Sequence, residues 1–100
     1  MGNRLFIYGT LINPEVQKNV LGRVADGVPD ALIGYKKSEI EVEGKEYPLI
    51  VPDEGEKVGG LVINVADREL EKIDEYETAV YKRKSVVLER GISAWVYVKG

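Results

Sequence analysis

A glutamate stands where an amphipathic helix should present an apolar residue to the core. Leu70, Ile73 and Glu77 fall on one stripe of a helical wheel drawn at about 100° per residue. A carboxylate on that stripe is partly removed from water and lies near the negative end of the helix dipole, and both effects raise its pKa. Because a raised pKa suits a general base, Glu77 is the candidate catalytic residue.

Other polar side chains near Glu77 leave alternatives open. Asp74 lies on the edge of the stripe and is either a second functional carboxylate or a partner of a backbone group or a nearby arginine. Tyr81 and Arg83 share one side of the strand that follows, where they either orient Glu77 and bind a substrate carboxylate or belong to a surface strand. If the helix ends early, Glu77 turns to solvent or pairs with Lys82 or Arg83.

A second candidate site is the sequence Tyr8-Gly9-Thr10-Leu11, where an apolar run ends at a glycine just before a helix. Backbone N–H groups in such a turn have no ladder partner, Gly9 allows close approach, and Thr10 adds a hydroxyl. These groups suit an anion or an oxyanion. The alternative is an ordinary turn at the end of a strand.

The composition limits the chemistry. The 100 residues contain no cysteine and no histidine, so thiolate and imidazole catalysis are excluded and a metal site would need oxygen ligands. A net charge of −3 without a basic stripe argues against nucleic acid as a partner. No apolar run approaches the roughly 20 residues that span a bilayer, and we expect a cytoplasmic protein. The high lysine and glutamate content is typical of a thermophilic source.

The pattern of apolar residues and turns predicts a single α+β domain over residues 1–100. Two helices are expected, over 14–21 after Asn13 and over 68–77 with Asp67 as its N-cap. Six or so strands are expected, over 4–8, 31–35, 39–42, 58–65, 85–88 and 94–98, with 47–52 as an arm that returns alongside 39–42. The prolines in 47–52 indicate an irregular or edge segment, and 53–56 reads as a polar turn. A mixed, curved sheet or small barrel with two flanking helices would bury the core.

Several stretches, taken in order, resemble the gamma-glutamylcyclotransferase-like family, especially its AIG2-like branch. They are Leu-Phe-Ile-Tyr-Gly-Thr-Leu at 5–11, Pro-Glu-Val at 14–16, Val-Leu-Gly-Arg at 20–23, Ala-Leu-Ile-Gly-Tyr at 31–35, Tyr-Pro-Leu-Ile-Val-Pro at 47–52, Val-Gly-Gly at 58–60 and the whole of 70–83. The resemblance implies a mixed-sheet barrel and a pocket between the loop 8–11 and a glutamate. It implies no cofactor.

The resemblance also implies roles for individual residues. The family pattern resembles Asp-x-x-Glu-Gly-x-x-Tyr-x-Arg, which places the catalytic glutamate at Glu77, with Asp74, Tyr81 and Arg83 at the other matching positions. The substrate-binding residues that it implies are Tyr8, Gly9, Thr10, Leu11, Tyr81 and Arg83.

The activity that it implies converts a gamma-glutamyl amide or amine to 5-oxoproline and a free amine, with a small-molecule substrate. The alternative is a non-catalytic module that binds a small anion or metabolite in the same pocket. One position departs from the pattern, because Thr78 stands where the family has glycine. Positive φ is costly for threonine, so we expect the exit from the helix to differ.

Overall fold

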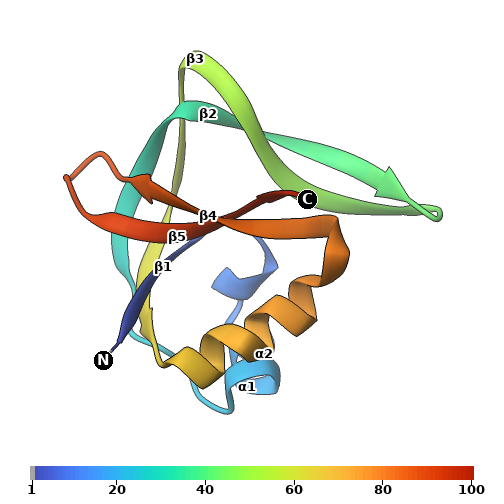
Figure 1. Ribbon diagram of the computed structural model, residues 1–100, viewed down its shortest axis with the longest axis vertical. Coiled ribbons are helices and arrows are strands. Elements are labelled where there is room, and N and C mark those ends of the chain that lie inside the picture. The colour runs from blue at the N-terminus through green and yellow to red at the C-terminus, as the bar shows by residue number, and fades with distance from the viewer. Residues whose placement is uncertain (1) are drawn as a thin grey trace.

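Five strands form one curled mixed sheet with two helices on one side of it (Figure 1). The structure is a computed structural model that describes residues 2–100. The elements are β1 (Asn3–Ile7), α1 (Pro14–Leu21), β2 (Val28–Val42), β3 (Lys45–Val65), α2 (Asp67–Glu77), β4 (Tyr81–Val87) and β5 (Ser93–Lys99), with short 3-10 turns η1 (Thr10–Ile12) and η2 (Thr78–Val80). The strand order is β2-β3-β1-β5-β4, in which only the β1–β5 pair is parallel among the described strands. The expected α+β fold with a curved mixed sheet is confirmed.

The expected count of about six strands is wrong, because two long strands replace four short ones. β2 runs through 31–35 and 39–42, and β3 runs through 47–52 and 58–65. The segment 53–56 is a bulge rather than a turn between separate strands, because the register moves from Ile33↔Lys57 to Tyr35↔Pro52. The bulge lets one long hairpin bend while its strands remain paired.

The two prolines of β3 lie on its open edge. In the described register, residues 45–52 pair with β2, whereas β1 pairs with β3 only from Leu61 to Val65. Pro48 and Pro52 therefore need no partner on their other side, which explains how a strand accommodates both. The expected edge position of this segment is confirmed, and its expected irregularity is limited to the bulge.

The far end of the long hairpin is a tight turn at Glu43-Gly44. Both residues have positive φ, 50° and 80°, and Val42 pairs with Lys45 across a two-residue loop. This backbone matches the right-handed twist of the flanking strands. The seven residue pairs from Lys36↔Val51 to Val42↔Lys45 form an arm that extends to the right in Figure 1.

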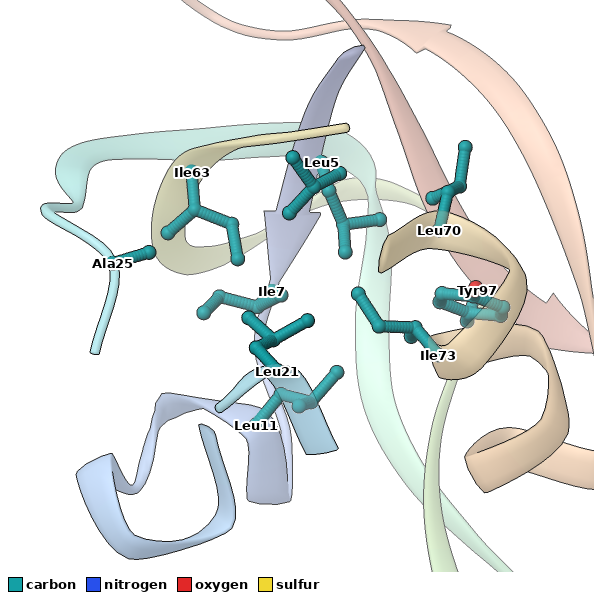
Figure 2. Packing of buried hydrophobic residues seen from close by; sticks show 10 residues of the cluster. Leu5, Ile7, Leu11, Leu21, Ala25, Ile63, Leu70, Ile73 and Tyr97 are labelled. Carbon is teal, nitrogen blue, oxygen red and sulfur yellow. The ribbon is translucent and has the colours of Figure 1, made fainter. Parts of the chain in front are cut away.

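The core lies in two clusters on opposite faces of the sheet. One cluster joins α1 and α2 to the sheet through residues such as Leu5, Ile7, Leu21 and Ile73 (Figure 2). The other fills the inside of the curl with Phe6, Tyr8, Leu32, Ile50, Val58, Val62, Leu88, Ala94, Val96 and Val98. Successive residues of β1 therefore pack alternately into the two clusters, as the two-residue period of a strand requires.

Gly60 lies where the backbone packs closely. A Cβ atom there would collide with the carbonyl oxygen of Ile7 and would lie 2.8 Å from Cζ of Phe6, whereas one at Gly59 would meet nothing within 4 Å. Glycine at position 60 therefore allows β3 and β1 to pack closely.

The two helices begin in different ways. Asn13 Oδ1 accepts a hydrogen bond from the N–H of Glu15 at 2.9 Å, so α1 has the expected N-cap and begins at Pro14 as predicted. The N-cap of α2 is Ala66 rather than the predicted Asp67, because Glu69 accepts the Ala66 N–H at 2.8 Å. The side chain of Asp67 instead accepts a hydrogen bond from Asn3 Nδ2 at 2.8 Å.

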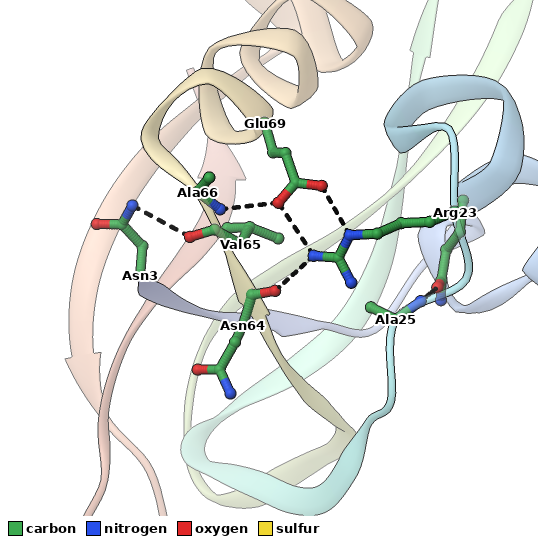
Figure 3. Close-up of polar contacts among 8 residues, drawn as sticks. Asn3, Arg23, Ala25, Asn64, Val65, Ala66 and Glu69 are labelled. Carbon is green, nitrogen blue, oxygen red and sulfur yellow. Dashed lines mark hydrogen bonds and ion pairs between the residues drawn. The ribbon is translucent and has the colours of Figure 1, made fainter. Parts of the chain in front are cut away.

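A polar cluster connects the end of α1 to the start of α2 (Figure 3). Arg23 donates two hydrogen bonds to Glu69, at 2.9 and 3.0 Å, and a third to the carbonyl oxygen of Asn64 at 2.9 Å. The arginine lowers the pKa of Glu69, chiefly by hydrogen bonding to its carboxylate. These contacts fix the orientation of α2 relative to the sheet. They therefore help to position Glu77, the last residue of the helix.

No helix within residues 2–100 is both long and apolar enough to cross a membrane.

Candidate functional site

A pocket opens where β1 ends, between the loop that follows it and the last turn of α2. The pocket is shallow, and the space of about 340 Å³ between its walls includes open solvent. Its lining residues are Phe6, Ile7, Tyr8, Gly9, Thr10, Leu11, Pro48, Glu77, Tyr81 and Tyr97. The structure therefore brings Glu77 and Tyr81 together with the loop 8–11, which is distant from them in the sequence.

Glu77 is half-buried in this pocket and faces no cation there. Among the described residues no lysine or arginine lies within ion-pair distance of its carboxylate. Burial raises the pKa of Glu77 to about 7. A carboxyl group with this pKa exchanges protons readily at neutral pH, as a general acid or base must.

The loop side of the pocket offers backbone donors. In η1 the N–H of Ile12 bonds to the carbonyl oxygen of Gly9 at 3.1 Å, and the N–H of Asn13 bonds to that of Thr10 at 3.0 Å. The first N–H groups of a helical turn have no partner within it, and within residues 2–100 those of Gly9, Thr10 and Leu11 donate no hydrogen bond. Such a run of free donors can bind an oxyanion or a carboxylate.

Two tyrosines hold the walls of the pocket in place. Tyr8 donates its hydroxyl hydrogen to the carbonyl oxygen of Tyr97 at 2.5 Å, and Tyr81 donates to the carbonyl oxygen of Pro48. Burial raises the pKa of Tyr8 well above its usual value, and burial with the nearby Glu77 raises the pKa of Tyr81 to about 12. Both phenols are therefore neutral near pH 7.

A third tyrosine joins the two sides of the pocket. The hydroxyl oxygen atoms of Thr10 and Tyr76 lie 2.9 Å apart and share a hydrogen bond. Tyr76 precedes Glu77 in α2, and its side chain is exposed. The contact connects the loop directly to the helix that carries the glutamate.

Arg83 does not line the pocket. Its Nε donates to Asp74 Oδ1 at 2.8 Å, and its guanidinium stacks on the ring of Trp95 at 4.9 Å from the centroid. Tyr97 Oη donates to the same oxygen of Asp74 at 2.6 Å. Of the two alternatives for Asp74, pairing with a nearby arginine is what the structure contains. The substrate-binding role of Arg83 stays a prediction that this geometry does not favour.

Within residues 2–100 no three acidic side chains gather closely enough to form a metal site. The polar groups of the pocket are one carboxylate, three phenols, a hydroxyl and backbone amides. This set suits acid-base chemistry on a small polar molecule.

Comparison with known proteins identifies the family. The sequence matches the family described as "Gamma-glutamyl cyclotransferase, AIG2-like" over residues 5–100. The chain belongs to this family. It is 42% identical over 83 residues to AIG2-like protein C of Arabidopsis thaliana, covering 82% of this chain and 47% of that protein. It is 38% identical over 89 residues to protein AIG2 C of the same plant, covering 88% and 53%. The chain thus spans about half the length of the curated relatives it matches.

Solved structures of related proteins share the fold. A solution structure of an Arabidopsis thaliana protein has 33% sequence identity and a TM-score of 0.83, covering 99% of this chain and 62% of its own. A structure named gamma-glutamyl cyclotransferase has 19% identity and a TM-score of 0.82, covering 100% and 68%. The second likeness shows the fold alone.

The helix exit after Glu77 has an unusual backbone for this AIG2-like chain. Thr78 has φ 61° and ψ −167°, a combination that glycine adopts freely and other residues adopt only at a cost. Thr78 therefore adopts positive φ despite the cost to a β-branched residue, and whether the helix exit differs from that of the family stays a prediction. Its N–H bonds to the carbonyl oxygen of Asp74, which closes the last turn of the helix.

The sequence assigned no specific role to three contributors to the site. Pro48 arrives from the long hairpin, Tyr97 from β5, and Tyr76 bonds to Thr10 from the helix. Tyr97 carried a weak signal, because a buried tyrosine needs a partner for its hydroxyl group. Pro48 carried none, since its position depends on the register of a strand pair distant from the loop.

Proposed function

We propose that this AIG2-like chain is a gamma-glutamylcyclotransferase-like enzyme that converts a gamma-glutamyl amide or amine to 5-oxoproline and a free amine. In this reaction the substrate's own α-amino nitrogen attacks its γ-carbonyl carbon. A ring C–N bond forms, the original amide C–N bond breaks, and the amine leaves. The substrate supplies the nucleophile, which is consistent with a pocket that has neither cysteine nor histidine.

The observation that carries the proposal is one pocket lined by both a half-buried carboxyl group and a run of free backbone donors. Glu77 is on one side, and the N–H groups of Gly9, Thr10 and Leu11 are on the other. Cyclisation needs a base for the ammonium proton and donors for the oxyanion, and the lining supplies both kinds of group.

In the proposed mechanism Glu77 first removes a proton from the substrate's α-ammonium group. The freed amine attacks the γ-carbonyl carbon, and the backbone N–H groups of the loop stabilise the negative charge that develops on oxygen. Glu77 then gives this proton to the departing nitrogen, and the carboxylate so regenerated takes the second proton that the ring nitrogen must lose, since the nitrogen of 5-oxoproline keeps one hydrogen. A pKa of about 7 for Glu77 supports this double role, because neither protonation state is strongly disfavoured at neutral pH.

The walls would contribute positioning rather than proton transfer. Tyr8 and Tyr81 are neutral phenols fixed by hydrogen bonds to backbone carbonyl groups. A fixed, largely apolar wall would hold the substrate folded, with its amine near its own carbonyl carbon. Correct orientation of two reacting groups lowers a barrier substantially.

A second candidate function is a non-catalytic module that binds a small anionic metabolite in this pocket. It is favoured by Thr78, whose strained backbone departs from the family's glycine next to the proposed catalytic residue. Free backbone donors serve a bound carboxylate as well as an oxyanion.

The test is a panel of gamma-glutamyl amides and amines incubated with the protein, with 5-oxoproline quantified by mass spectrometry. The enzyme proposal predicts release that is proportional to protein concentration for at least one substrate. Calorimetric titration of the same compounds identifies binding without turnover. Binding with no 5-oxoproline would support the module, and neither binding nor turnover would overturn both proposals.

A further inference from the structure

A second concave surface lies away from the pocket, between the long hairpin and the β4–β5 hairpin. This groove is open to solvent, and the space of about 950 Å³ between its walls includes that open region. Its floor is apolar and includes Ile50, Pro52 and Val98. Two strands that are far apart in the sheet order form its walls, because Lys84 of β4 contacts Tyr35 of β2 at 3.0 Å.

The rim of the groove is basic. Lys82, Lys84 and Lys99 line it, and no acidic residue does. Among the described residues none of these three lysines makes an ion pair. The groove therefore combines an apolar floor with uncompensated positive charge, which fits an occupant that is both apolar and acidic.

The arm of the long hairpin carries the opposite charge. Residues on one face of a two-stranded ribbon follow a period of two, so Glu39, Glu41 and Glu46 share a face with Ile50 and Tyr35. Lys37, opposite Ile50 at the base of the arm, lies on the same face. The three glutamates are exposed. Glu39 and Glu46 lie close together, and the hydrogen bond to Glu46 and its negative charge raise the pKa of Glu39.

One face of the molecule thus has a basic half at the base of the arm and an acidic half near its tip. The arm's seven residue pairs span about 23 Å at the usual rise per residue. A second copy related by a two-fold axis across the arms would lay each acidic tip over the other copy's basic groove. Such a self-complementary surface is what an isologous dimer requires.

We propose that this face is a dimer interface, in which the acidic arm of each copy occupies the lysine-rimmed groove of the other. The occupant is a second copy rather than an unrelated acidic peptide because both complementary halves are present on one chain. Contact through a narrow ribbon is small, so the dimer belongs with weak, salt-sensitive associations. The catalytic proposal does not depend on it.

The first experiment measures the oligomeric state by sedimentation equilibrium up to about 1 mM protein at low and high salt. We expect a concentration-dependent dimer that dissociates at least about tenfold more readily as sodium chloride rises from about 50 to 500 mM. A chain that is monomeric at the highest concentration would overturn the proposal.

The second experiment exchanges charges. Glu41→Lys with Glu46→Lys makes arm and groove both basic, and Lys82→Glu with Lys84→Glu makes both acidic. We expect each double variant alone to be monomeric and an equimolar mixture to form a heterodimer, because both contacts are then complementary. A mixture that does not associate would contradict the proposed pairing.

The matched control for net charge is Glu15→Lys with Glu71→Lys, two exposed glutamates on the helices. This variant has the same net charge as the arm variant, and we expect it to dimerise like the wild type. If the control loses dimerisation as much as the arm variant does, net charge alone explains the loss, and the proposed interface is overturned. Thermal unfolding curves establish that each variant is folded before its association is interpreted.

Discussion

Asp74 accepts a hydrogen bond from Arg83 at 2.8 Å, one helical turn before Glu77. The same carboxylate oxygen accepts the hydroxyl hydrogen of Tyr97, so two strands bind the last turn of α2 through a single atom. Arg83 and Asp74 are both partly exposed, at 29% and 38% of their side chains. Their pairing orients the end of α2. Asp74 and Arg83 therefore have a structural role, whereas the residues that line the pocket face the proposed substrate.

Removing the Asp74 carboxylate should destabilise the protein measurably. In Asp74→Ala both donors lose their acceptor, and we expect a loss of about 1–3 kcal/mol in the free energy of unfolding. Urea denaturation with an unchanged slope measures it. Glu89→Ala, which removes an exposed ion pair with Lys57 at 3.4 Å, is the control and should change stability by less than about 0.5 kcal/mol. Equal effects would contradict the anchoring role.

Thr78→Gly should stabilise the fold. Glycine adopts the observed φ of 61° and ψ of −167° without strain, and this gain exceeds the added chain entropy of the unfolded state. We expect about 1 kcal/mol, measured as a higher denaturation midpoint. Thr78→Ala is the matched control, because alanine keeps a Cβ at positive φ and should give no such gain. A destabilised Thr78→Gly would show that the threonine backbone is unstrained.

The glycine pair of β3 allows a comparison between neighbours. Gly60→Ala places a methyl group against the carbonyl oxygen of Ile7 and the ring of Phe6, so we expect a loss of about 2 kcal/mol. Gly59→Ala, where the space is open, should change stability by less than about 0.5 kcal/mol. Chemical denaturation of the two variants side by side is the measurement, and similar values would contradict the packing described for Gly60.

Stability should depend on pH through Glu77. Its pKa is about 7 in the folded protein and close to 4.5 without burial, so the folded state holds this proton more tightly. Between these two values the unfolded chain binds fewer protons, and the contribution of Glu77 to stability falls as pH rises.

The measurement is the difference in unfolding free energy between wild type and Glu77→Gln across pH 4 to 8. We expect wild type to lose about 1–2 kcal/mol relative to the variant over this interval, after allowance for solvent screening. Glu75→Gln, at an exposed position of the same helix, should follow the wild type. A difference that is constant with pH would show that Glu77 is not desolvated in the fold.

The sequence predicted those parts of the fold that local chemistry determines. Asn13 and Pro14 specify where α1 begins, and the pattern that ends in Glu77 specifies the buried face of α2. The continuity of β3 through Pro48 and Pro52 was not predictable, because it depends on which edge of the strand stays unpaired. Ala66 rather than Asp67 is the N-cap of α2, and the Asp67 side chain instead accepts a hydrogen bond from Asn3, 64 residues away in the sequence.

For the candidate site too, the sequence predicted individual residues but not their arrangement. Glu77 was evident from its place on an apolar stripe, and the loop 8–11 from its glycine. Their meeting in one pocket was implied by family resemblance rather than by spacing. Arg83 was grouped with the pocket because it shares a strand side with Tyr81, yet Asp74 and Trp95 hold it outside. The two-residue period of a strand predicts on which face of the sheet a side chain lies, but it does not predict which pocket that side chain lines.

The most direct test of the catalytic proposal compares 5-oxoproline release by wild type, Glu77→Gln and Glu75→Gln on one gamma-glutamyl substrate. The account predicts that Glu77→Gln lowers kcat by about 10²- to 10⁴-fold while the protein stays folded, because the amide can neither accept nor return the proton. Glu75→Gln should retain the wild-type rate. Undiminished turnover in Glu77→Gln would contradict the account.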